Sequence, residues 1–481
     1  MSRFTTSAPL SRREVIRDAV TTLGGRRHRD TDAFTVLSRD AMQGIADRAL
    51  KRSTADGCEI TVTSTVAGNT RFAANQLATA GDVTDTTVTV NTSFGPKHAI
   101  VQINDTSDDA IAAAVARSEV LAKLAPDDPD AMPPVGPQQY PSVDAYFEGT
   151  ASVTPEQRAR AALTALQPAR ASSGAEASVA AGYIIVVSRA TLLTNKTGLS
   201  AYHRDTDANY TLTVRTADGT GSGWAGADER DWGKIDAGAI ATHALEKARR
   251  SRDAVAVEPG RYTVVLEPQA VGDLVQLLNF FLDARQADEG RSPFTSSSGG
   301  SKVGQKVADS SVTLFSDPAD PQLLAAPFDG EGYPLTRQVW IDKGVLANLS
   351  YSRFWAKKQN KPFSGIRNSI KLAGGSSTLD DMIKGTERGI LVTRLWYLRP
   401  VDPRTALFTG LTRDGTYLIE HGAVTHPVKN FRFNDSPIFL LNNVEAMSAP
   451  VRLAGTEAGG DVAMPAVKAH DFNFTSLSDA V

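Results

Sequence analysis

Two spacings of apolar residues alternate along the first half of the chain. Apolar positions recur at helical spacing over 40–52, 105–124, 154–166 and 235–250, and this spacing predicts four amphipathic helices. Apolar and polar residues alternate, as in half-buried strands, over 58–66, 83–90, 99–103, 177–187 and 210–216. The helices and strands follow one another along the chain, so the first half is predicted to be a mixed α/β domain.

The second half has a different pattern. A strand over 262–267 is followed by one apolar-striped helix, predicted over 268–285, and beyond residue 330 short β runs dominate, such as 338–341, 390–397 and 417–420. This pattern predicts a curled sheet or barrel. We therefore expect an α+β protein with a flexible amino terminus (1–30), an amino-terminal α+β domain (31–255) and a carboxyl-terminal, β-rich, barrel-like domain with a few helices (256–481).

Three segments are predicted to be irregular. Six prolines lie between Pro126 and Pro141, so this stretch is expected to be an ordered extended loop or a crossing segment. The glycine-rich run 219–226 lacks the Gly-Lys-Ser/Thr ending of a phosphate-binding loop and is interpreted as a turn between strands. The Ser- and Gly-rich segment 292–304 is expected to be a mobile surface loop.

Composition and charge exclude several classes of function. The formal net charge is -3, which gives no broad positive field for nucleic acid. The sequence contains no run of roughly 18 apolar residues, so no membrane span is predicted. The single cysteine, Cys58, cannot form an internal disulfide, which favours a reducing, cytoplasmic location. Ser11-Arg12-Arg13 is only a degenerate match to a twin-arginine export signal, because charged residues follow where an apolar core is needed.

Five blocks, in sequence order, resemble one known family. They are TRFAANQ at 70–76, LAKLAPDDPD at 121–130, FDGEGYP at 328–334, TRDGTYLIEHG at 412–422 followed by Pro427-Val428-Lys429, and PAVKAHDFNFTS at 465–476. Together they resemble the TldD and TldE/PmbA family of bacterial peptidases over roughly residues 40–476. The resemblance implies a dimer, formed with a TldD-like subunit or with itself, an enclosed cavity, and a role in degrading or trimming unfolded peptides.

Within that family, TldD-like subunits carry an H-E-x-x-x-H helix and a distant cysteine that bind zinc, and TldE/PmbA-like subunits lack these ligands. The corresponding helix here, 268–285, contains no histidine, and no histidine lies between His243 and His421. A hydrolytic zinc site needs several imidazole, thiolate or carboxylate ligands around the ion. The helix offers only Asp273 and Asp283, so we expect no metal in this chain and zinc in a TldD-like partner.

The remaining candidate ligands have structural interpretations. Cys58 lies on a predicted amino-terminal strand and is expected to be packed rather than to bind metal. His421-Gly422 follows an apolar strand and is expected to be the two-residue turn of a β-hairpin, which needs positive φ. Polar residues of the 268–285 helix are expected on a solvated edge.

The leading hypothesis is a TldE/PmbA-like subunit that forms the substrate chamber with a TldD-like partner and holds an extended peptide. The candidate peptide-binding residues are Asp273, Gln276, Asn279, Asp283 and Arg413. One alternative is a stand-alone, homodimeric peptide-binding scaffold without protease activity. Another is independent hydrolysis through an atypical metal site that includes Asp273, Asp283 or His421, and metal analysis separates it from the first two.

Overall fold

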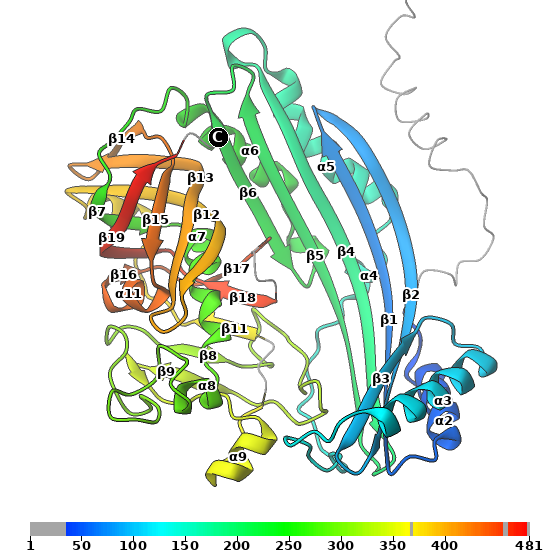
Figure 1. Ribbon diagram of the computed structural model, residues 1–481. Helices are drawn as coiled ribbons and strands as arrows, with labels where there is room; N and C mark the ends of the chain where they lie inside the picture. The colour runs from blue at the N-terminus through cyan, green and yellow to red at the C-terminus, as the bar shows by residue number, and fades with distance from the viewer. Residues whose placement is uncertain (1–34, 366–368, 456–459, 479–481) are drawn as a thin grey trace, which may run out of the picture.

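The structure is a computed structural model that describes residues 35–365, 369–455 and 460–478 (Figure 1). The expected flexible terminus over 1–30 and the degenerate export signal at Ser11-Arg12-Arg13 lie outside the described residues. The elements of the first half are α2 (Arg39–Arg52), β1 (Gly57–Ala73), β2 (Gln76–Phe94), β3 (Lys97–Ile103), α3 (Asp108–Leu124), α4 (Glu148–Ala151), α5 (Pro155–Ala171), η1 (Gly174–Glu176), β4 (Ser178–Asn195), β5 (Ser200–Thr216), β6 (Ser222–Glu229), η2 (Trp232–Lys234) and α6 (Ala237–Arg250).

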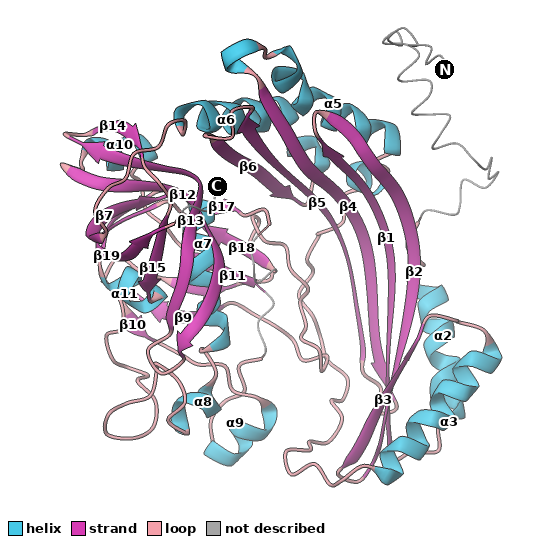
Figure 2. Ribbon diagram, turned by 45° about the horizontal axis from the view of Figure 1, so that its top comes forward, coloured by secondary structure: helices cyan, strands magenta, loops and turns pink. Residues whose placement is uncertain are grey.

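These first six strands form one antiparallel sheet with the order β3-β2-β1-β4-β5-β6. The sheet is long and strongly curved, and its convex face carries α2 and α3 at one end and α5 and α6 at the other (Figures 1 and 2). The second half of the chain lies on the concave side. The sheet is therefore covered by helices on one face and turned toward the rest of the molecule on the other.

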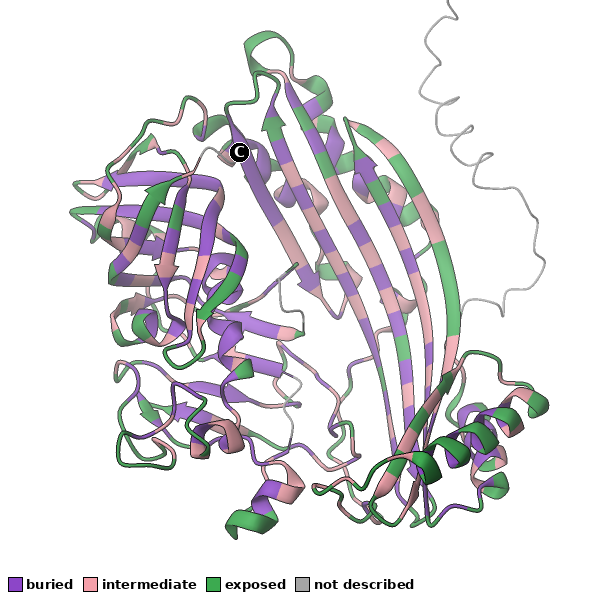
Figure 3. Ribbon diagram, in the orientation of Figure 1, coloured by how far each residue is buried: buried purple, intermediate pink, exposed green. Residues whose placement is uncertain are grey.

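The sequence specifies these helices through their caps and their apolar faces. Ser38, Ser107, Thr154 and Asp236 each accept a hydrogen bond from a backbone N–H in the first turn of α2, α3, α5 and α6. Apolar side chains of the helices then pack on the buried side of the strands in two clusters. Burial alternates along the strands (Figure 3), because successive side chains point to opposite faces of a sheet.

The second half contains shorter elements. They are β7 (Gly260–Leu266), α7 (Pro268–Val275), η3 (Gln276–Phe280), α8 (Ala284–Asp288), β8 (Leu314–Ser316), β9 (Gln338–Asp342), β10 (Val345–Leu346), α9 (Arg353–Gln359), β11 (Ser369–Leu372), α10 (Leu379–Lys384), β12 (Arg388–Asp402), β13 (Leu407–Glu420), β14 (Ala423–Pro427), β15 (Phe431–Asp435), α11 (Pro437–Asn442), β16 (Val444–Met447), β17 (Val451–Arg452), β18 (Asp461–Met464) and β19 (Val467–Leu477). The proposed domain boundary near residue 256 falls between α6 and β7.

Five of these strands close into a barrel. The hydrogen-bonded order is β12-β7-β19-β15-β13, and the pairing of β13 with β12 completes the ring. Four phenylalanines, Phe431, Phe433, Phe472 and Phe474, are almost fully buried and pack against one another. A second sheet, β10-β9-β8-β11-β18-β17, lies beside the barrel. The predicted α+β class with a β-rich, barrel-like second half is confirmed.

The structure corrects two of the predicted loops. The turn predicted over 219–226 is shorter, because β6 begins at Ser222 and its Gly223 lies directly under helix α6, where a Cβ would come within 2.3 Å of the Ala244 carbonyl. The segment 292–304 is not wholly on the surface, because Ser292 and Phe294 are buried. Ser292 donates to the Phe281 carbonyl at 3.1 Å, and this contact ties the start of the segment to the core.

The proline-rich stretch 126–141 is extended, as predicted. No helix among the described residues combines the length and the apolar character needed to cross a membrane.

Candidate functional site

The helix predicted over 268–285 is broken into three pieces. Helix α7 ends at Val275, the 3₁₀ turn η3 follows, and α8 starts only at Ala284. Asp283 has an extended backbone (φ -101, ψ 122) and accepts a hydrogen bond from Gln286 N at 2.7 Å, so it caps a new helix instead of continuing the first one. The long-helix prediction is wrong because apolar periodicity does not reveal a cap inside an apolar run.

The expected solvated edge of this helix is also wrong. Asp273 is fully buried, and its two carboxylate oxygens accept hydrogen bonds from Gln269 Nε2 at 2.9 Å and from Leu395 N at 3.1 Å. Gln276 is 1 % exposed, and its carboxamide has no hydrogen-bond partner among the described residues. Asp273 therefore fastens α7 to strand β12 of the barrel.

The other candidate peptide-binding residues lie in different surroundings. Asn279 is half-buried in η3. Arg413, on β13, lies 4.1 Å from the centre of the Trp396 ring and 3.7 Å from the Asp414 carboxylate. Burial lowers the pKa of Arg413, Asp414 raises it, and neighbouring arginines lower it further. None of the five candidates lines the cleft of about 750 Å³ between the two halves of the described chain.

The donor set does not fit a hydrolytic zinc ion. Both oxygens of Asp273 are engaged inside the core, and Asp283 caps α8. His421 sits in the hairpin turn with φ +50, as predicted, and its side chain is 85 % exposed beside Glu387. Across the three described stretches of chain, no group of three or more His, Cys, Asp or Glu is placed to hold a metal.

Cys58 is buried, as predicted, and burial raises the pKa of its thiol. A thiol held neutral in this way suits packing rather than metal binding.

A cleft with a volume of about 750 Å³ lies between the two halves of the chain. One wall is the end of the sheet at which β1 begins, β2 ends and β3 begins. The second wall is the proline-rich loop over 128–135. The third wall consists of Glu331 with Ser352, Arg353 and Phe354. The volume is in the range of pockets that bury small ligands or a few side chains. This cleft is the best-formed candidate binding site.

Polar contacts hold the proline-rich loop against the second half and so shape the cleft. Arg353 donates to the Pro133 carbonyl at 2.6 Å and pairs with Glu331 at 2.9 Å. Tyr140 donates its hydroxyl proton to the Gly332 carbonyl at 2.7 Å. Arg285 forms an ion pair with Asp130. Pro133 and Pro134 need no donor partner, so the loop can run extended across the gap without unsatisfied N–H groups at these positions.

Glu59 is the electrostatically unusual group in the cleft. It lies on β1, on the opposite face from the buried Cys58 and Ile60. The pKa of Glu59 is raised to about 7: burial is the largest cause, Glu331 adds to the rise, and Arg353 partly offsets both. Its carboxylate forms no hydrogen bond or ion pair with the residues that the structure describes. A carboxyl group with a pKa near neutrality is a feature of binding and catalytic sites.

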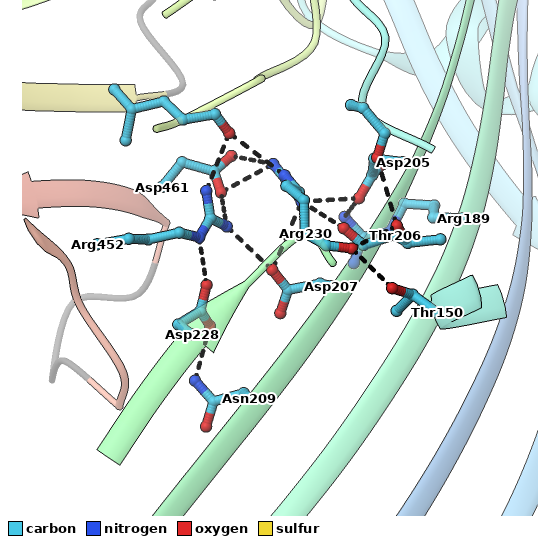
Figure 4. Close-up of polar contacts among 12 residues, drawn as sticks. Thr150, Arg189, Asp205, Thr206, Asp207, Asn209, Asp228, Arg230, Arg452 and Asp461 are labelled. Atoms are coloured by element: carbon cyan, nitrogen blue, oxygen red, sulfur yellow. Dashed lines mark hydrogen bonds and ion pairs between the residues drawn. The ribbon is translucent and has the colours of Figure 1, made fainter. Parts of the chain in front are cut away.

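A second polar cluster joins the two halves through crossed ion pairs (Figure 4). Arg230, at the end of β6, donates to both oxygens of Asp461 on β18 at 2.9 and 2.8 Å. In the opposite direction, Arg452 on β17 reaches Asp228 at 2.5 Å and Asp207 at 3.0 Å. Each half thus supplies an arginine to the other half's carboxylates.

This cluster is largely dry and carries more negative than positive groups. The side chains of Arg230 and Arg452 are 9 % and 5 % exposed. The pKa of Asp207 is raised to about 7: burial is the largest cause, Asp228 adds to the rise, and the two arginines partly offset it. Burial lowers the pKa of Arg452, but the surrounding carboxylates outweigh this effect and raise it. The cluster therefore fixes the halves relative to each other, and with them the walls of the cleft.

Sequence reasoning missed both Glu59 and the crossed ion pairs. Glu59 is one polar position in an alternating strand, where an exposed carboxylate is the ordinary interpretation. The partners Arg230 and Asp461 are 231 residues apart, and no local pattern relates them. The block FDGEGYP at 328–334 was a usable signal for the cleft, because Glu331 lies in it.

Comparison with known proteins follows the same division of the chain. The sequence profile of the PmbA/TldA metallopeptidase C-terminal domain matches residues 259–476. A protein named metalloprotease from Methanothermobacter thermautotrophicus is 26% identical over 226 residues, which are 43% of this chain and 47% of that protein. Another metalloprotease, from Archaeoglobus fulgidus, is 30% identical over 204 residues, 40% of this chain and 47% of that protein. The match thus spans about half the length of these relatives.

Solved structures extend the likeness to nearly the whole chain. TldE from Thermococcus kodakarensis superimposes with a TM-score of 0.80 at 19% identity, covering 90% of this chain and 100% of that one. A putative modulator of a DNA gyrase from Thermotoga maritima gives 0.78 at 17% identity, with 90% and 100% covered. A similarly described protein from Bacteroides thetaiotaomicron gives 0.76 at 20% identity, with 91% and 98% covered. At these identities the likeness establishes the fold.

The match to the family profile covers the half that contains the barrel, and the structural likeness to TldE covers 90% of this chain. The profile match therefore assigns residues 259–476 to the PmbA/TldD family, and the chain as a whole shares the fold of TldE.

Proposed function

We propose that this chain is a peptide-holding subunit of a TldD/PmbA-type peptidase. It forms the substrate chamber with a zinc-bearing, TldD-like partner and binds unfolded peptides without cutting them alone. The profile match over 259–476 supports the peptidase assignment, and the likeness to the Thermococcus kodakarensis TldE favours that type of subunit over a TldD type. The single, buried cysteine suits a reducing compartment, so the proposal places the chain in the cytoplasm.

The observation that carries the proposal is the chemistry of the helix that follows β7. Zinc hydrolysis needs several imidazole, thiolate or carboxylate ligands with an open position for water. Helix α7 contributes only Asp273, and both of its oxygens already accept hydrogen bonds inside the core. This arrangement supports a structural helix at the place where a catalytic subunit of this family would carry its ligands.

The cleft supports the peptide-holding part of the proposal. It lies between the two halves, has about 750 Å³ of space, and combines a strand end with carboxylates and apolar side chains. An extended peptide can be held through its backbone beside a strand, which tolerates many sequences.

The test is to purify this chain with a TldD-like homologue from the same organism, if one is encoded, and to measure co-elution and cleavage of an unfolded peptide. We expect a mixed complex whose cleavage rate exceeds that of the partner alone, and no cleavage by this chain alone. A partner whose activity is indifferent to this chain, with no mixed complex, would contradict the proposal. Peptide binding by a self-associated form in that case would favour the stand-alone scaffold.

A further inference from the structure

The geometry points to a specificity site within the cleft: we propose that it takes the guanidinium or ammonium group of a basic side chain from an extended peptide, with Glu59 as the acceptor. This inference rests on the proposed peptide-holding role and names the kind of residue that the subunit would select. It concerns the wall formed by the start of β1, the loop over 128–135 and the start of α9.

The lining of the cleft is rich in carboxylates. Five line it, and four of them already have partners: Asp56 accepts from Gly95 N at 3.1 Å, Asp128 lies 3.7 Å from His98, Asp130 pairs with Arg285, and Glu331 pairs with Arg353 at 2.9 Å. The fifth, Glu59, has no hydrogen bond or ion pair within the described parts of the chain. The arginine of the lining that lowers the pKa of Glu59, Arg353, is divided between Glu331 and the Pro133 carbonyl.

An unpaired, partly buried carboxylate favours a cationic ligand. In the free chain, burial and Glu331 hold the pKa of Glu59 at about 7, so its charged form is costly near neutral pH. A guanidinium or ammonium group beside it would supply the missing opposite charge and form a charge-assisted hydrogen bond. The neighbouring strand residues do not replace such a ligand: Asn195, directly across from Glu59 on β4, donates its amide to the Val135 carbonyl at 2.8 Å.

The rest of the lining suits the aliphatic stem of a lysine or arginine. Met132, Val135 and Phe354 contribute apolar surface beside the carboxylates, and long basic side chains bury their methylene stems on such surface while the charged end reaches a polar group. A divalent metal fits less well, since the described residues contain no group of three His, Cys, Asp or Glu placed to hold one. A free polyamine shares the ammonium chemistry, so the test includes it as a competitor.

The test measures binding of two labelled, unfolded peptides that differ only in one central residue, Arg or Gln, by fluorescence anisotropy with the full chain. The variant Glu59→Gln keeps the shape of the side chain and removes the charge. The matched control is Asp85→Asn, which removes an exposed carboxylate from β2 outside the cleft. Circular dichroism of each variant verifies that it is folded.

At a pH of about 8, we expect the Arg peptide to bind the wild type about tenfold more tightly than the Gln peptide, from one charge-assisted hydrogen bond. Glu59→Gln should abolish this preference, and Asp85→Asn should keep it. Lowering the pH to about 6 should weaken the preference, because Glu59 becomes protonated while the ligand stays charged.

Three results would overturn the inference. If both peptides bind equally and Glu59→Gln changes nothing, the cleft does not select basic residues, although the chain still holds peptides. If neither peptide binds, the specificity site is refuted, and co-elution and cleavage with the partner still decide the proposed function independently. If spermidine binds at Glu59 and the Arg peptide does not compete, the site takes a free amine and the peptide assignment fails.

Discussion

Replacing Arg452 by methionine removes one of the two guanidinium groups that join the halves of the molecule. Methionine keeps most of the buried stem, so the change isolates the charge and its hydrogen bonds. Asp228 loses its arginine partner, Asp207 and Asp461 keep only Arg230, and the Leu323 carbonyl loses a donor at 2.9 Å. Removing one partner from a buried ion pair costs about 3–5 kcal/mol because the remaining charge is left uncompensated.

The deficit should depend on pH in a defined direction. The pKa of Asp207 is already raised to about 7 in the folded state, mainly by burial, and removing Arg452 takes away a charge that lowers it. A carboxyl group with a raised folded-state pKa contributes stability below its unfolded pKa of roughly 4, and this contribution is lost as the pH rises through the folded value. The variant's loss of unfolding free energy relative to wild type should therefore be largest above a pH of about 7. This loss should become smaller as the pH falls toward about 5.

Urea unfolding of the wild type and of Arg452→Met, followed by circular dichroism and by tryptophan fluorescence, measures the loss. Arg432→Met is the matched control, because Arg432 is exposed on β15 and its side chain forms one long hydrogen bond, 3.3 Å to Thr409, within the described chain. It should change stability by less than about 0.5 kcal/mol. The reasoning is refuted if Arg452→Met costs no more than this control, or if its deficit grows as the pH is lowered.

Three further changes test other parts of the account. Glu59→Gln should raise the free energy of unfolding by about 1–3 kcal/mol at a pH near 8, since the pKa of Glu59 rises from 4.5 to about 7 on folding, and the gain should vanish near a pH of about 4.5 in a pH series of urea melts. Gly223→Ala should destabilise the fold by about 1–3 kcal/mol, because the added Cβ would meet the backbone of α6. Gly136→Ala, where a Cβ would meet no atom within 4 Å, should leave the stability unchanged, and thermal melts of both variants measure the difference. His421→Asn should be neutral or stabilising by about 0.5 kcal/mol, because Asn-Gly suits a turn with two positive φ values, and a clear loss of stability would contradict the turn assignment.

Local periodicity was enough to find most helices and strands and too weak to give their lengths. The strand predicted over 58–66 is β1, which continues to Ala73, and that predicted over 83–90 is β2, which runs from Gln76 to Phe94. Their extra residues are mainly alanine, glycine, threonine and other polar residues, with only Phe72, Leu77 and Phe94 as large apolar side chains, and so carry little apolar alternation. They remain in strands because each is paired with a neighbour along almost its full length, and such pairing is a non-local effect.

The candidate site was harder to predict for the same reason. Asp273 and Gln276 are polar, so sequence reasoning placed them on a solvated edge, but both are buried. The hydrogen bond from Leu395 N, 122 residues away, makes the burial of Asp273 tolerable. His421 and Cys58 were assigned correctly because a two-residue turn and an alternating strand are local patterns.

Zinc content decides whether this chain has a hydrolytic metal centre of its own. The full chain would be purified without a partner, dialysed, and analysed by plasma mass spectrometry for zinc per chain. We expect no stoichiometric zinc or other transition metal. One firmly retained ion per chain, lost on replacing Asp273 or His421, would contradict the claim and restore independent hydrolysis as the leading explanation.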